Sequence, residues 1–106
     1  MGRLNLANMG IVNMDARTFD NPELNNLEIL NLEGNRLNEL SDPVIFNKLT
    51  NLRELNLSGN NLRNIKANVF SGLKKLELFN LNFNKLTENE LPFILKVLIY
   101  LEFILR

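Results

Sequence analysis

The 106-residue sequence contains no cysteine and no histidine, and its five glycines form no phosphate-binding loop. Without cysteine the chain has no internal disulfide, no metal–thiolate site and no thiol nucleophile. Without histidine it also lacks the usual general base and a common zinc ligand. Its aspartates, such as Asp15 and Asp42, are far apart in the sequence. We therefore expect no enzyme, with no catalytic residues, no metal site and no cofactor.

The sequence also has no excess of positive or negative charge. Lys plus Arg and Asp plus Glu both number 12, so the formal net charge is zero. A neutral chain has no overall field to recruit nucleic acid or an anionic membrane. We expect no nucleic acid partner.

No apolar run is long enough to cross a membrane. The longest lies at residues 91–106, where Lys96 and Glu102 interrupt it. A transmembrane helix needs about 20 predominantly apolar residues, so no membrane insertion is expected. Pro92 suits the first turn of a helix instead. We predict a short outer helix that leads into a strand beginning near Leu101.

The dominant feature is an internal repeat. Three stretches superpose: Leu27-x-x-Leu30-x-Leu32-x-x-Asn35-x-Leu37, Leu52-x-x-Leu55-x-Leu57-x-x-Asn60-x-Leu62 and Leu76-x-x-Phe79-x-Leu81-x-x-Asn84-x-Leu86. Their starts are 52 − 27 = 25 and 76 − 52 = 24 residues apart. Degenerate copies begin at Met1 and Leu101. A period of about 20–29 residues is typical of a solenoid.

Each repeat has the pattern of a short strand followed by a turn. The alternation Leu30-x-Leu32 predicts a strand with one buried face, and Gly34-Asn35 predicts a bend directly after it. Successive strands can pair in parallel, and stacking then buries leucines that a single repeat would leave exposed.

Two further columns of equivalent residues are predicted to be structural. The asparagines at 35, 60 and 84 have side chains that both donate and accept, so they can satisfy backbone groups of their own and the adjoining repeat. The phenylalanines at 19, 46 and 70 occur once per repeat in its outer half. We predict that they form a packed spine rather than a ligand groove.

These motifs resemble the leucine-rich repeat family, in the version of about 24 residues found in extracellular and Toll-type receptor ectodomains. The resemblance implies an α/β repeat solenoid, with a short parallel sheet on its concave face and irregular, 3-10 or short helical segments on its convex face. It implies one domain over residues 1–106, with repeats starting near 1, 27, 52 and 76 and an incomplete one from 101. Extracellular members usually carry cysteine-rich caps and a signal peptide. Neither pattern occurs in this sequence, so a piece of a longer array or an unusually small member is expected.

Function is then expected on the concave sheet face. Strand alternation directs the residues between the buried leucines outward. The predicted partner-binding residues are Arg3, Asn5, Ile29, Asn31, Glu33, Glu54, Asn56, Ser58, Leu78, Asn80, Asn82 and Phe83.

Two columns of this face lead to different expectations. The asparagines at 5, 31, 56 and 80 form either a solvated polar row or a row that hydrogen-bonds a polypeptide. Ile29, Leu78 and Phe83 are apolar, and Phe103 is predicted to continue the column beside Leu78. Such a cluster is either a binding patch or a contact with further repeats.

Two functional hypotheses remain from different classes. The first is a protein-protein interaction module that binds a partner on the concave face, and the second is an architectural segment without a ligand. An extracellular or cell-surface location follows from the resemblance, with the cytoplasm as the alternative. Asn56-Leu57-Ser58 is a triplet of the type that accepts N-glycans. The apolar residues from Leu101 to Leu105 predict a strand edge through which the chain associates with itself.

Overall fold

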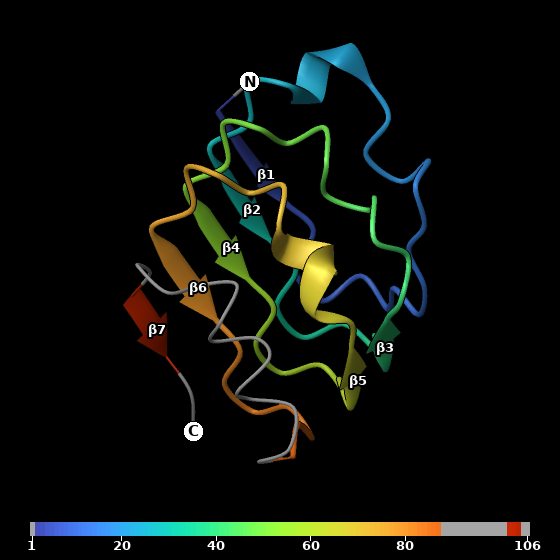
Figure 1. The fold of residues 1–106 in the computed structure, drawn as a ribbon. Coiled ribbons are helices and arrows are strands. Elements are labelled where there is room, and N and C mark those ends of the chain that lie inside the picture. The colour runs from blue at the N-terminus through green and yellow to red at the C-terminus, as the bar shows by residue number, and fades with distance from the viewer. Residues whose placement is uncertain (1, 88–101, 105–106) are drawn as a thin grey trace.

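The structure is a computed structural model and describes residues 2–87 and 102–104 (Figure 1). Five short strands form one parallel sheet in the order β1-β2-β4-β6-β7. They are β1 (Arg3–Asn5), β2 (Ile29–Asn31), β4 (Glu54–Asn56), β6 (Leu78–Asn80) and β7 (Glu102–Ile104). The predicted stacking of one strand per repeat is confirmed.

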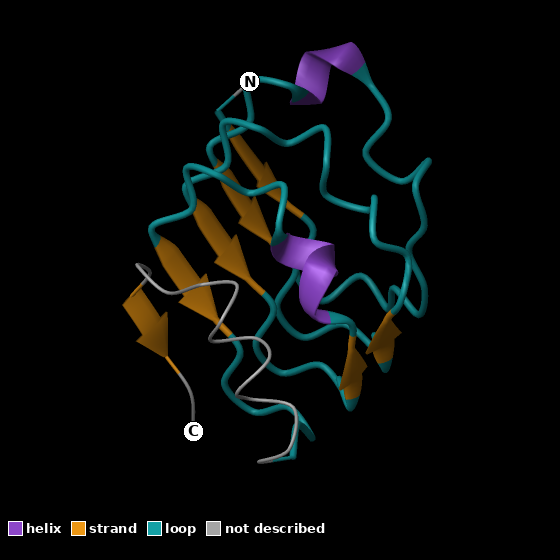
Figure 2. Cartoon of the chain, in the orientation of Figure 1, coloured by secondary structure: helices purple, strands orange, loops and turns teal. Residues whose placement is uncertain are grey.

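The rest of each repeat returns over the other side of the sheet (Figure 2). This outer layer contains two 3-10 helices, η1 (Pro22–Leu24) and η2 (Ala67–Phe70), and the two-stranded parallel sheet of β3 (Glu39–Leu40) and β5 (Asn64–Ile65). No helix in the described ranges is long and apolar enough to cross a membrane. The helix predicted after Pro92 lies outside the described residues. The predicted α/β repeat solenoid is confirmed.

The middle residues of β2, β4 and β6 face the core. Leu30 and Leu55 are Cα partners, Leu55 pairs with Phe79, and all three are almost fully buried. Full burial of such a side chain contributes about 1.5–3 kcal/mol. Phe103 is the Cα partner of Phe79, so the prediction that it lies beside Leu78 is wrong. The residue opposite Leu78 is Glu102.

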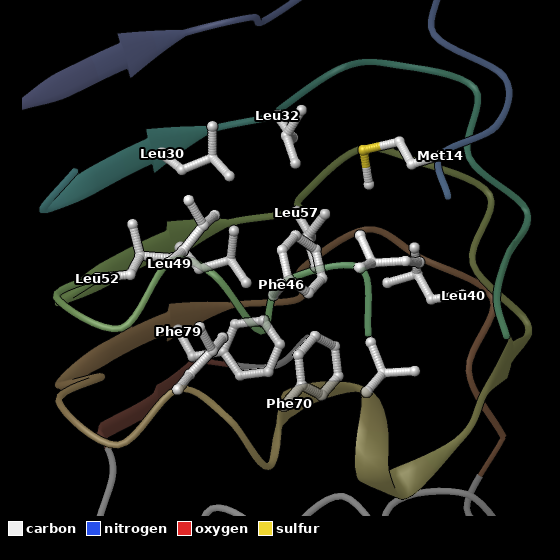
Figure 3. Close-up of a cluster of buried hydrophobic side chains, with 14 of the residues drawn as sticks. Met14, Leu30, Leu32, Leu40, Phe46, Leu49, Leu52, Leu57, Phe70 and Phe79 are labelled. Carbon is white, nitrogen blue, oxygen red and sulfur yellow. The ribbon is translucent and has the colours of Figure 1, made fainter. Parts of the chain in front are cut away.

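Phenylalanine rings pack along the outer half of the core. Phe46 stacks on Phe19 and on Phe70 with ring centroids 5.9 Å apart in each pair. Phe70 meets Phe79 edge to face at 4.7 Å (Figure 3). All four rings are buried, which confirms the predicted spine. The spine joins the outer layer to the sheet.

The asparagine ladder is also confirmed. Asn60 Nδ2 donates to the carbonyls of Leu57 in its own repeat, at 3.1 Å, and of Leu32 in the preceding one, at 3.0 Å. Its Oδ1 accepts from the backbone N–H of Leu37 at 3.2 Å. The side chains of Asn35 and Asn84 make the same two kinds of contact. Each asparagine therefore fastens the turn of the repeat before it.

Candidate functional site

The outward residues of the strands form the concave face of the sheet. A shallow hollow of about 220 Å³ runs across β2, β4 and β6 on this face. It is lined by Ile29, Leu30, Asn31, Glu54, Leu55, Asn56, Leu78 and Asn80. Six of these eight are predicted site residues, and the structure brings them together.

The first outward column mixes apolar and charged side chains. Ile29, Glu54 and Leu78 are consecutive Cα partners and all are half-buried. Arg3 precedes them as the exposed partner of Ile29. Two aliphatic side chains therefore flank one carboxylate in the middle of the hollow.

The second outward column consists of asparagines with a local structural role. Each Oδ1 accepts a hydrogen bond of 2.9–3.0 Å from the backbone N–H two residues later, which ends the strand with an Asx turn. This holds for Asn5, Asn31, Asn56 and Asn80. Their Nδ2 groups make no hydrogen bond within the part of the chain that the structure describes. The row thus offers mainly donors, and the sequence pattern alone did not indicate this.

The third column departs from the prediction. Glu33 is exposed, but Ser58 and Asn82 are only 3% and 7% exposed. The prediction of outward, accessible side chains at these two positions is therefore wrong. All three residues follow strand ends, where the chain already bends and strand alternation no longer applies. The short side chains of Ser58 and Asn82 stay within the turn, whereas the longer side chain of Glu33 reaches solvent. The Ser58 hydroxyl donates to Glu33 Oε1 at 3.2 Å and so positions a residue of the face.

Phe83 combines exposure with backbone strain. Its side chain is 65% exposed and its φ is +58°. The equivalent positions in the two preceding repeats are Gly34 and Gly59, also at positive φ. A left-handed conformation costs a residue with a Cβ atom roughly 1–2 kcal/mol. This repeat therefore carries backbone strain at a position where the two preceding repeats have glycine.

The remaining chemistry of the face is limited. No group of three acidic residues that could hold a metal ion occurs within residues 2–87 and 102–104. Arg53, just before β4, pairs with Glu77 at 2.9 Å, and this hydrogen bond raises the pKa of the guanidinium. Asn56, the predicted glycan acceptor, is half-buried within β4, and the serine of its triplet is buried.

Comparisons with known proteins agree with this architecture. The family model described as Leucine rich repeat matches residues 25–86. The TLR13 chain in a crystal structure of a TLR13–ssRNA13 complex is 34% identical, with a TM-score of 0.81. The match covers 99% of this chain and 14% of that one.

A structure of an LRR protein from Leptospira interrogans is 25% identical, with a TM-score of 0.54. That match covers 74% of this chain and 25% of the other. The chain thus spans a small part of the length of both solved chains. No curated protein matches the sequence.

Proposed function

The chain belongs to the leucine-rich repeat family, and on that premise we propose that it is an interaction module that binds a protein partner on its concave face. One observation carries the proposal, namely that apolar side chains gather on the open face of a parallel sheet. Parallel sheets are normally covered on both faces. Here the face around Ile29 and Leu78 is covered by nothing in the described part of the chain, and the exposed Phe83 lies just beyond β6.

The groups on the face suggest the chemistry of the partner. An apolar side chain fits between Ile29 and Leu78, where Glu54 attracts a neighbouring cation and repels an acidic segment. The free amide donors of Asn31, Asn56 and Asn80 suit the backbone carbonyls of a polypeptide. We propose a polypeptide segment that carries apolar and basic residues.

The wider setting belongs to the same proposal. We propose a non-enzymatic module, because family members of this kind are typically binding modules. We propose that it is part of a longer repeat array, because both solved relatives are several times longer. The similarity to the TLR13 chain supports an extracellular or cell-surface location. The TLR13 chain was crystallised with ssRNA13. Nucleic acid is therefore the competing ligand to test, although the carboxylates of Glu33 and Glu54 would repel phosphates.

The alternative is an architectural segment that spaces or stiffens a larger protein. It predicts that substitutions on the concave face have no effect on binding. The row of Asx turns supports this alternative, because it gives the asparagine column a structural role without any ligand.

Selection of displayed peptides on the immobilised chain tests the proposal. The selected peptides should be apolar and basic. The double substitution Leu78→Ala, Phe83→Ala should weaken their binding by about 30-fold or more, because truncation of one good anchor costs about 2 kcal/mol. The melting temperature of the double variant should stay close to that of the unmodified chain, which would show that the loss of binding does not come from unfolding.

The matched control is Arg17→Ala with Lys74→Ala, because both residues are exposed and lie outside the concave face. This pair should bind like the unmodified chain. Equal binding by the two double variants would refute the concave face as the binding surface. Selection of single-stranded oligonucleotides over peptides would refute the proposed partner class.

A further inference from the structure

A second hollow, of about 410 Å³, lies on the flank of the solenoid beyond the turns. Three of its lining residues are cations, Arg36, Arg63 and Lys85, and they come from three successive repeats. The lining also includes Glu39 and three asparagines, Asn38, Asn61 and Asn64. None of these residues takes part in the concave face, so this basic flank is a separate surface.

The cations of the basic flank are not neutralised. Three positive side chains face one carboxylate, a local net charge of 3 − 1 = +2. None of the three makes an ion pair within the described ranges. By contrast, Lys48 pairs with Asp20 at 3.1 Å and Arg53 pairs with Glu77 at 2.9 Å. The basic flank therefore gathers three unpaired cations although the total charge of the chain is zero.

The backbone beneath these cations is fixed by contacts between repeats. The N–H of Arg36 donates to the carbonyl of Ile11 at 2.8 Å, that of Arg63 to Asn38 at 2.9 Å, and that of Lys85 to Leu62 at 2.9 Å. Each cation thus extends from backbone that is bonded to the preceding repeat. Neighbouring repeats lie about 4.8 Å apart. Arg36 and Lys85 occupy the same position two repeats apart, and Arg63 lies two residues further along the repeat between them, so the charges form a staggered group rather than a single point.

We propose that the basic flank binds an acidic segment of a polypeptide. Guanidinium groups pair with carboxylates through two parallel hydrogen bonds, and the amides of Asn38, Asn61 and Asn64 can both donate to and accept from peptide groups. A single-stranded nucleic acid usually needs aromatic side chains on which its bases stack. None of the described residues that line this hollow is aromatic.

The two surfaces then select opposite charges. Glu33 and Glu54 on the concave face repel an acidic segment, whereas Arg36, Arg63 and Lys85 on the flank attract it. A chain with no net charge thereby presents two surfaces that attract segments of opposite charge. The proposal does not depend on the concave face being a binding site.

A fluorescein-labelled peptide of alternating Glu and Gly tests the proposal by fluorescence anisotropy. Substitution of Arg36→Gln with Arg63→Gln should weaken binding about five- to tenfold, the effect of removing two exposed charge pairs. Arg17→Gln with Lys74→Gln removes the same charge elsewhere and should change binding less than twofold. Binding should also weaken as salt is raised from low to physiological concentration.

Equal losses in the two double variants would overturn the assignment, because attraction would then depend on total charge alone. Tighter binding of a labelled oligothymidine than of the peptide would replace the acidic polypeptide with a phosphate backbone. A loss in Leu78→Ala with Phe83→Ala would move the peptide to the concave face. Unchanged melting temperatures show that each variant remains folded.

Discussion

Replacement of Asn60 by leucine tests how much one rung of the asparagine ladder stabilises the fold. Asn60 is 5% exposed, and its side chain bonds to four backbone groups: Leu37 N–H and the carbonyls of Leu32, Leu57 and Ser58. Leucine has a similar size but cannot make any of these bonds. The cost therefore reflects lost hydrogen bonds more than lost packing.

The four backbone groups differ in whether they keep another hydrogen bond after the substitution. Leu32 O keeps a bond from Asn35 Nδ2, Leu57 O keeps one from Asn84 Nδ2, and Ser58 O keeps one from Gly34 N–H. Leu37 N–H loses the hydrogen bond that Asn60 provides. One buried donor without a partner costs about 1–3 kcal/mol. With smaller losses at the three carbonyls, we expect about 2–3 kcal/mol.

Such a loss is large for a small domain. It corresponds to a fall in melting temperature of about 10–20 °C, measured by circular dichroism, and to a lower urea midpoint with an unchanged slope. Asn61→Leu is the control, because its exposed side chain makes no hydrogen bond to another described residue. Equal melting temperatures for the two variants would refute the ladder as a source of stability.

Asn60→Asp separates the two roles of the same side chain. The carboxylate keeps an acceptor for Leu37 N–H but places a second oxygen against the carbonyls that Nδ2 contacts. We expect this environment to raise the pKa of the new carboxyl in the folded state, so that the variant is destabilised near pH 7 and gains stability as pH falls towards 4. A stability difference from the unmodified chain that is the same at both pH values would contradict this.

Four further outcomes are expected. Phe46→Ala should cost about 3–5 kcal/mol, because the ring is buried between two others, whereas Val44→Ala at a 42% exposed position should cost far less in the same urea titration. Phe83→Gly should stabilise the fold by up to about 1 kcal/mol, because glycine adopts the positive φ without strain, and it should weaken the binding of any ligand on the concave face. A lower melting temperature would contradict the proposed strain at this position. Glu77→Gln should barely change the melting temperature, because the ion pair with Arg53 is exposed on both sides. If the edge at β7 mediates self-association, Ile104→Lys should shift sedimentation towards the monomer; this site is preferable to Phe103, which aligns with the core residue Phe79.

Much of the fold could be predicted because the same residue pattern occurs in several repeats, and equivalent positions have equivalent structural roles. Leu30, Leu55 and Phe79 occupy one position of the pattern and one column of the core. The ladder and the phenylalanine spine followed from the same logic, since one residue type recurs at one place per repeat. Agreement between the copies identified which positions are structural.

The register of the last strand could not be predicted in this way. Leu101-x-x-Ile104 fits the template, yet the strand pairs one residue earlier, with Phe103 opposite Phe79. Both phases offer apolar residues, so the pattern does not choose between them. A shift of one residue exchanges the two faces of a strand, and only pairing with the neighbouring strand decides the phase.

The candidate site was only partly predictable for related reasons. Ile29, Glu54 and Leu78 lie inside strands, where alternation holds, and they share the hollow as expected. Ser58 and Asn82 lie after strand ends, where alternation fails. The basic flank was missed altogether, because Arg36 and Lys85 occupy one position of the repeat and Arg63 another, so no column of charge is visible in the sequence.

The direction of the asparagine ladder has a consequence for the order in which the chain is made. Because Asn60 completes the turn at Leu37 and Asn84 completes the turn at Leu62, each turn depends on a side chain that the ribosome adds later. At about 5–20 residues per second, the 84 − 60 = 24 residues between two rungs take about 1–5 s to synthesise. During that interval the N–H of Leu62 can bond only to water, and the arrival of Asn84 in the next repeat replaces that water.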